Sequence, residues 1–167
     1  MEQSVMEGCE TAYVSEQAAA ADAAQPLQYM KEQLGIKDVD IRTYSPLALA
    51  YIGDCVFDML IRTIIVSQGN MAVQKYHKKV STLVNAHAQA EMITGLEPEL
   101  TEEEQNIYKR GRNSKPATMA KNASAKEYKT ATGMEALLGY LYLTNQYTRL
   151  IDLVKRSIEI WEENHKV

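Results

Sequence analysis

The sequence is poor in the residues that make turns. Its 167 residues include 8 glycines and 4 prolines, whereas a β-sandwich or a β-barrel needs many turn residues. Its two cysteines, Cys9 and Cys55, lie far apart, which argues against a disulfide framework and a CxxC metal site and favours a reducing compartment. No segment alternates strictly between apolar and polar residues, as a half-buried strand would. These absences predict an all-α protein.

Signals for secretion or membrane insertion are also missing. The N-terminus is acidic and has no basic stretch followed by an apolar one, so a secretory signal is not expected. The longest apolar run, residues 47–65, contains Asp54, Asp58 and Arg62. Each of these charges costs about 2.5–3.5 kcal/mol at the centre of a bilayer. We therefore expect a cytoplasmic protein with no membrane partner, in which this run is a buried helix.

The length predicts one folded domain preceded by a tail. Residues 1–26 are rich in Ala, Glu and Gln and have no sustained apolar face, so we expect them to be disordered. Residues 27–167 then form a single domain of ordinary size. Apolar periodicity and end signals predict five helices there, over residues 46–67, 72–94, 101–110, 125–144 and 147–162.

Two helix starts are marked clearly in the sequence. Ser45 precedes Pro46, which is typical of a capping residue followed by a proline at the first helical position. Thr101 and Glu104 have the spacing of a capping box. The helix that begins at Pro46 is apolar nearly all round, so it needs burial on several sides, either inside the domain or against a second subunit.

Positive charge is concentrated in one part of the chain. The net charge is -4, but residues 109–129 contain seven basic residues and one acidic residue, a local charge of +6. Cations mixed with Asn, Ser and Thr suit contacts with nucleic-acid phosphates. A solvated loop that keeps the protein soluble explains the same composition, and both interpretations remain open.

Two carboxylates lie in the middle of apolar segments, Asp54 and Glu135. An ionised carboxylate is costly to bury, so each needs a cation, a metal or hydrogen-bond donors. The two acids are therefore either a pair of ligands for a hard cation or core acids held by local partners. Asp58 needs no such explanation, because Arg62 lies four residues later and predicts an ion pair along the helix.

Three segments together resemble the ribonuclease III family. YIGDCVF at residues 51–57 and MEALLGYLYL at residues 134–143 are similar to its two carboxylate-bearing helices, in the same order and at a similar separation. KRGRNSK at residues 109–115 resembles a loop typical of the Mini-III branch, which lacks a double-stranded-RNA-binding domain. The resemblance covers roughly residues 40–160. It implies an all-helical endoribonuclease that works as a homodimer, cleaves double-stranded RNA with Mg²⁺, and in bacteria matures the precursor of 23S ribosomal RNA.

The resemblance also implies roles for single residues. It assigns Asp54 and Glu135 as the catalytic, metal-binding carboxylates. Full ribonuclease III carries further acids where this chain has Leu47, Ala50 and Thr132, a departure that fits the Mini-III branch. Water and RNA phosphate oxygens would then complete the coordination of Mg²⁺. The residues expected to contact RNA are Arg110, Arg112, Asn113, Lys115, Lys121, Asn122 and Lys78.

Two other functions remain open from the sequence. One is a catalytically silent RNA-binding or ribosome-associated dimer of the same fold, which the three missing acids suggest. The other is a purely structural helical dimerisation module, which leaves the basic segment unexplained. Salt-sensitive binding of duplex RNA would count against the second.

Overall fold

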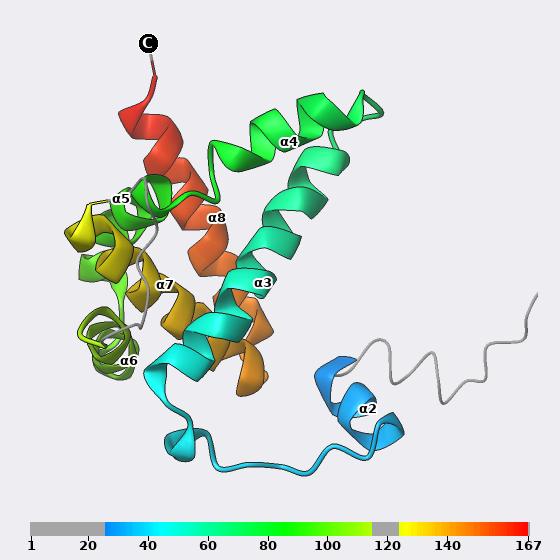
Figure 1. Ribbon diagram of the computed structural model, residues 1–167, viewed down its shortest axis with the longest axis vertical. Helices are drawn as coiled ribbons and strands as arrows, with labels where there is room; N and C mark the ends of the chain where they lie inside the picture. The colour runs from blue at the N-terminus through cyan, green and yellow to red at the C-terminus, as the bar shows by residue number, and fades with distance from the viewer. Residues whose placement is uncertain (1–25, 115–123, 167) are drawn as a thin grey trace, which may run out of the picture. The chain divides into compact units, whose positions relative to one another are not determined.

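The computed structural model of the protein describes residues 26–114 and 124–166. These residues form seven α-helices and two 3₁₀ helices, and no strand is present among them, which confirms the all-α prediction (Figure 1). Helix α2 (Pro26–Gln33) belongs to a unit that ends at Asp38, and the second unit begins at Val39. The second unit contains η1 (Ile41–Thr43), α3 (Pro46–Val66), α4 (Val73–Ser81), α5 (Ala86–Leu96), η2 (Glu97–Glu99), α6 (Glu102–Arg112), α7 (Ala125–Leu143) and α8 (Tyr147–Asn164).

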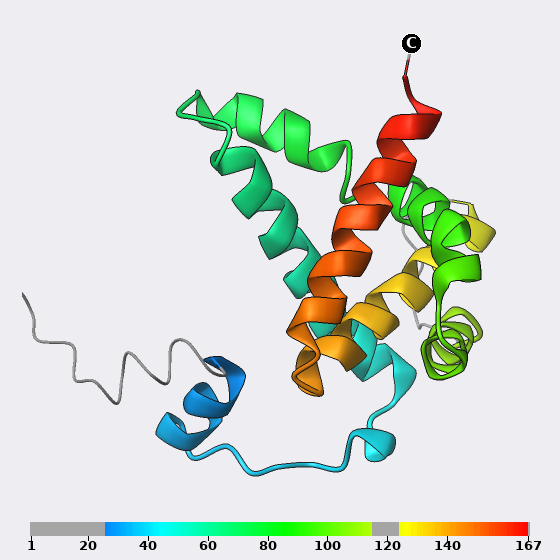
Figure 2. The same ribbon diagram turned by 180° about the vertical axis from the view of Figure 1, so that it is seen from behind.

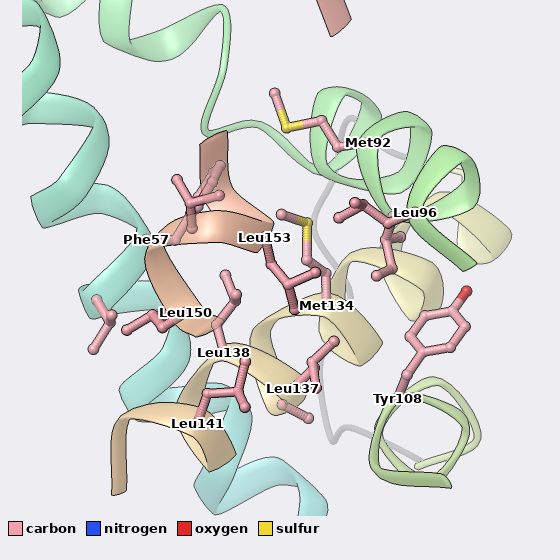
Figure 3. Close-up of a cluster of buried hydrophobic side chains, with 14 of the residues drawn as sticks. Phe57, Met92, Leu96, Tyr108, Met134, Leu137, Leu138, Leu141, Leu150 and Leu153 are labelled. Atoms are coloured by element: carbon pink, nitrogen blue, oxygen red, sulfur yellow. The ribbon is translucent and has the colours of Figure 1, made fainter. Parts of the chain in front are cut away.

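Helix α7 is the centre of the second unit. It packs against α3, α5, α6 and α8, and views from opposite sides show these helices around it (Figures 1 and 2). From Thr130 to Leu141 every residue of α7 is buried except Glu135. Figure 3 shows Met134, Leu137 and Leu138 of α7 within the core. Each fully buried side chain of this kind contributes about 1.5–3 kcal/mol, so α7 is held firmly on all sides.

The predicted helix starts are confirmed by their capping hydrogen bonds. The Ser45 hydroxyl accepts a hydrogen bond from the amide of Ala48 at 3.1 Å, and Pro46 occupies the first turn of α3. At α6, the Thr101 hydroxyl accepts from the Glu104 amide and the Glu104 carboxylate accepts from the Thr101 amide. These bonds satisfy backbone amides that have no partner within the helix.

The prediction of one helix over residues 72–94 is wrong, because the chain bends between α4 and α5. Asn85 is responsible: its side-chain oxygen accepts a hydrogen bond from the Ala88 amide at 2.9 Å, and its side-chain nitrogen donates to the carbonyl oxygens of Ser81 and Thr82. One residue thus satisfies the end of α4 and the start of α5. As a result α4 packs on α3, whereas α5 packs on α7 and α8.

Helix α3 buries only one side within a single chain. Phe57 and Ile61 have no exposed surface, but Tyr51 is 80% exposed and Met59 is 55% exposed. The predicted ion pair between Asp58 and Arg62 is present on this helix. Across the part of the chain that the structure describes, no helix is both long enough and apolar enough to cross a membrane.

Candidate active site

The two predicted carboxylates lie where α3 and α7 cross in direct backbone contact. A Cβ atom added at Gly53 would lie 1.8 Å from the backbone oxygen of Glu135, and one added at Gly139 would lie 1.9 Å from the backbone oxygen of Leu49. Only glycine allows backbones to approach so closely. Asp54 follows Gly53 directly, so this crossing brings Asp54 and Glu135 together although 80 residues separate them in the sequence.

Glu135 has a strongly perturbed carboxyl group. The pKa of Glu135 is raised to about 8, chiefly by burial and in addition by the negative charge of Asp54. A hydrogen bond from the side chain of Gln89 acts in the opposite direction, because it stabilises the charged form. The effect of Asp54 on Glu135 shows that the two carboxylates are close enough to repel each other.

Asp54 is the more accessible of the two acids. It is exposed in the single chain, yet partial desolvation raises its pKa, and the nearby charge of Asp58 adds to the effect. Asp58 is itself paired with Arg62. Asp54 and Glu135 therefore form one acidic site with an open side at Asp54 and a buried side at Glu135.

Neither acid is neutralised by a cationic side chain within the described ranges. None of the ion pairs found there includes Asp54 or Glu135. Two adjacent carboxylates without a counter-charge are unfavourable unless a cation binds between them or one is protonated. Carboxylate oxygens are ligands that Mg²⁺ accepts, usually one or two per site with several waters, so the residues present fit this ion.

The protein supplies few ligands to such a cation. Over residues 26–114 and 124–166, no three His, Cys, Asp or Glu side chains gather in a way that could hold a metal. This agrees with Leu47, Ala50 and Thr132 standing where other acids might have contributed. A cation held by Asp54 and Glu135 would keep coordination positions free for water and for a phosphate oxygen of a substrate.

Gln89 is a site residue that the sequence analysis did not find. It lies on α5, only 2% of it is exposed, and its side chain acts on Glu135 by lowering the pKa of that carboxyl group. A neutral amide between alanines gives no charge signal in the sequence. Its one unusual feature in the sequence is a polar side chain on an otherwise apolar helix face. That feature points to the site only when the position of Glu135 on α7 is known.

The residues expected to bind RNA are placed in different ways. Arg110 and Asn113 line an open hollow of about 590 Å³ beside the start of α3, with Pro46, Asn106, Lys109 and Ser114. Arg112 instead faces Glu97 at 3.7 Å and lies over the ring of Tyr108. Lys78 is exposed in the last turn of α4. Lys115, Lys121 and Asn122 lie outside the described residues.

The hollow provides polar donors and positive charge next to a helix start. Lys109 and Arg110 are exposed in the last turn of α6, and the Ser114 hydroxyl donates to the Gly111 carbonyl oxygen at 2.5 Å. This surface suits the phosphates of a nucleic acid better than an apolar ligand. Of the predicted set, the structure therefore brings Arg110 and Asn113 to one surface and turns Arg112 toward an acid.

Comparison with known proteins identifies the family. The Ribonuclease III domain matches residues 47–146, a range that includes Asp54 and Glu135. Mini-ribonuclease 3 of Clostridium tetani is 46% identical over 126 residues, covering 75% of this chain and 83% of that protein. Mini-ribonuclease 3 of Enterococcus faecalis is 42% identical over 130 residues, covering 76% and 98%. An X-ray structure of a protein from Fusobacterium nucleatum matches with a TM-score of 0.67 and 32% identity, covering 73% of this chain and 98% of that one. The chain therefore belongs to the ribonuclease III family, in its Mini-ribonuclease 3 branch, and is an endoribonuclease.

Proposed function

We propose that this endoribonuclease cleaves double-stranded RNA as a homodimer, with Mg²⁺ held by Asp54 and Glu135, and that its substrate is the precursor of 23S ribosomal RNA in the cytoplasm. One observation carries the proposal: the buried Glu135 lies at the backbone contact beside Asp54, whose charge raises its pKa, and neither acid has a cationic partner in the described parts of the chain. Such a pair is typical of a site that becomes stable when a divalent cation binds.

Each acid has a separate task in this mechanism. Mg²⁺, when bound, supplies positive charge for the scissile phosphate and lowers the pKa of a coordinated water. Glu135 would hold the cation as a buried ligand, since low polarity strengthens its attraction for a cation. Asp54 would hold it as the exposed ligand, which leaves room for a phosphate to approach. The contact of Gly53 with the backbone of Glu135 brings the backbones that carry the two acids together before RNA arrives.

The expected mode of RNA recognition follows from the shape of the duplex. A-form RNA offers its phosphates and 2′-hydroxyls, and its bases are hard to reach from the major groove. Arg110 and Asn113 would contact phosphates from the hollow beside α3, and Lys78 would contact them from α4. Lys115, Lys121 and Asn122 would add contacts from the basic segment, joined by Arg112 if it leaves Glu97. Affinity should then fall steeply with salt concentration.

The exposed side of α3 supports the homodimer. The large apolar side chains Leu47, Tyr51, Met59 and Val66 are 36%, 80%, 55% and 55% exposed in the single chain. Large apolar side chains exposed along one helix are typical of a protein interface. A second copy related by a twofold axis would cover both surfaces with one interface, and it would present two symmetric sites to the two strands of a duplex.

The test compares cleavage and binding in matched variants. A long double-stranded RNA is incubated with purified protein, with and without Mg²⁺, beside Asp54→Asn, Glu135→Gln and the control Asp152→Asn, which changes an exposed acid on α8. We expect Mg²⁺-dependent cleavage that falls about 100-fold or more in the first two variants, with RNA binding retained.

The control should cleave like the wild-type protein. Asp54→Asn with nearly full activity would overturn the assignment of the metal ligands. RNA binding by the wild-type protein without any cleavage would favour the catalytically silent alternative, in spite of the family membership. Cleavage that persists after chelation of divalent ions would overturn the dependence on Mg²⁺.

A further inference from the structure

Helix α4 buries little of its surface. Of its nine residues, Val80 is buried and Tyr76 is partly buried against the core, whereas the other seven are exposed. The position before its first turn is Ala72, which has no side chain that could cap the helix. Neither burial nor a cap therefore holds the start of α4, and its direction depends on other contacts.

The hydroxyl group of Tyr76 ties α4 to the turn that precedes it. It donates a hydrogen bond to the carbonyl oxygen of Gly69 at 2.8 Å and accepts one from the amide of Met71 at 3.1 Å. Gly69 has a φ of 121°, a conformation that favours glycine, at the point where the chain turns from α3 into α4 (Figure 1). One hydroxyl thus binds two backbone groups of this turn and holds the start of α4 in place.

The other contacts of α4 leave its positive charge intact. The Lys79 amino group donates to the side-chain oxygen of Gln68 at 2.9 Å. At the far end of the helix, the Asn85 side chain donates to the carbonyl oxygens of Ser81 and Thr82 at 2.9 and 3.1 Å. Each acceptor is neutral, so α4 is attached at both ends without neutralising its lysines.

The exposed surface of α4 carries charge of one sign. Lys75, Lys78 and Lys79 lie at i, i+3 and i+4 spacing and are exposed, so they are neighbours on the helix. Residues 59–90 contain no acid, although the chain has 22. Within the described ranges, no ion pair includes a side chain of α4. Such uncompensated cations suit the phosphates of a nucleic acid.

We propose that Tyr76 is a positioning residue for RNA binding, whose hydroxyl holds α4 at the angle at which Lys75 and Lys78 meet the phosphates of a duplex. The proposal rests on the proposed function of the enzyme in cleaving double-stranded RNA. Asp54 lies about 18 Å before the end of α3, at 1.5 Å per residue. A duplex that lies along α3 can therefore contact both the acidic site and α4. Tyr76 acts through the lysines and touches no RNA itself.

The test is the variant Tyr76→Phe, which removes the hydroxyl and keeps the ring. Binding of a labelled RNA duplex is measured by fluorescence anisotropy in a metal chelator, and cleavage of the same duplex is measured with Mg²⁺. We expect the Kd and the KM for RNA to rise about 3- to 10-fold, as for the loss of one or two hydrogen bonds. The kcat should stay within about twofold of wild type, because the hydroxyl affects binding and not the chemical step.

A double-mutant cycle shows whether the hydroxyl acts through the lysines. The pair Lys75→Gln and Lys78→Gln removes two cations, so it should raise the Kd for RNA and make binding less sensitive to salt. Adding Tyr76→Phe to this pair should have little further effect, because the two changes remove the same interaction. A hydroxyl effect of equal size in both backgrounds would overturn the positioning role. So would a folded Tyr76→Phe protein that binds RNA like wild type.

A matched control removes a tyrosine hydroxyl elsewhere. The Tyr140 hydroxyl donates to Glu103 at 2.8 Å and joins α7 to α6. Helix α6 is also held by its capping box and by Arg149, so Tyr140→Phe should bind RNA within about twofold of wild type. If Tyr140→Phe loses as much affinity as Tyr76→Phe, general destabilisation explains both results and the positioning role is overturned.

Two outcomes separate this proposal from the proposed function. If the double lysine variant binds and cleaves RNA like wild type, α4 does not contact RNA. The positioning role is then overturned, whereas cleavage of duplex RNA stands. If the wild-type protein neither binds nor cleaves a duplex, the proposed function fails and the role of Tyr76 fails with it.

Discussion

Glu135 holds a carboxyl group that releases its proton with difficulty. Its pKa is about 8, because the group is buried and lies beside Asp54, whereas an unfolded glutamate titrates near 4.5. Without a metal, the folded chain therefore keeps a proton on Glu135 at neutral pH. Mg²⁺ must displace this proton, so Mg²⁺ binding should become tighter as the pH rises toward 8.

The raised pKa of Glu135 predicts how stability depends on pH. The folded state binds the proton more tightly than the unfolded state, so the free energy of unfolding should fall as the pH rises between about 4.5 and about 8. The melting temperature of the wild-type protein in a metal chelator should therefore drop from pH 5 to pH 8. Glu135→Gln, which has no proton to lose, should show a smaller drop. Equal drops in the two proteins would contradict the raised pKa.

Single site residues differ in how far the sequence reveals them. Asp54 and Glu135 could be predicted, because a charge within an apolar run needs a partner and therefore draws attention. Gln89 could not, because its neutral amide matters only through a contact between α5 and α7 that no spacing indicates. Arg112 could not be placed either, since its contact with Glu97 depends on how α6 follows the turn at η2.

Helices α3 and α7 depend on glycine for their contact. The Cβ atom of an alanine at position 53 would overlap the backbone of Glu135, and a backbone atom cannot move aside as a flexible side chain can. We expect Gly53→Ala to lower the free energy of unfolding by more than about 2 kcal/mol and to weaken Mg²⁺ binding, as measured by chemical denaturation and calorimetry.

The control for this substitution is Gly95→Ala on α5. There the new Cβ would meet side-chain atoms of Ile160, the nearest being Cγ2 at 2.7 Å, and alanine gains about 1 kcal/mol in helix propensity over glycine. Gly95→Ala should therefore cost less stability than Gly53→Ala, because a side chain can shift where a backbone cannot. A Gly53→Ala protein as stable as Gly95→Ala would show that the helices can separate without cost.

Helices α6 and α8 are joined by an ion pair with a buried acid. Arg149 donates to both carboxylate oxygens of Glu104, at 2.8 and 2.9 Å, and this interaction lowers the pKa of Glu104. Arg149→Met should lower the free energy of unfolding by about 2–3 kcal/mol at neutral pH. Denaturation curves at several pH values measure the loss.

The sign of the pH effect follows from the lowered pKa. The stabilisation by Arg149 is present above the ordinary pKa of a glutamate and disappears as Glu104 takes up a proton at lower pH. The difference between the wild-type protein and Arg149→Met should therefore shrink in acid. Arg156→Met, which removes the ion pair with the exposed acid Glu99, should cost less. A difference independent of pH would point to packing and not to the ion pair.

Helix ends could be predicted where the sequence holds both halves of a cap. Thr101 with Glu104, and Ser45 with Pro46, gave starts that the structure confirms. The bend between α4 and α5 was missed, because apolar residues continue at helical spacing through residues 82–85. Asn85 was the available signal, but an asparagine inside a periodic segment can lie in a helix as easily as cap one.

The molecule as a whole has an apolar side on α3 that a second copy would cover. Replacing Tyr51 by glutamate should weaken the dimer strongly, because a charge would be buried in the interface. Sedimentation velocity measures the shift from dimer to monomer as the protein is diluted. The control Val73→Asp, which changes an exposed residue of α4, should leave the dimer intact. A Tyr51→Glu protein that remains dimeric would place the interface elsewhere.

The crossing of α3 and α7 at Gly53 and Gly139 also determines how the enzyme should lose activity on heating. No side chain separates the two backbones there, so the spacing of the backbones that carry Asp54 and Glu135 does not depend on a rotamer that loosens as temperature rises. This backbone spacing is kept while α3 and α7 remain packed and is lost when they separate. Thermal inactivation and thermal unfolding should consequently follow the same curve.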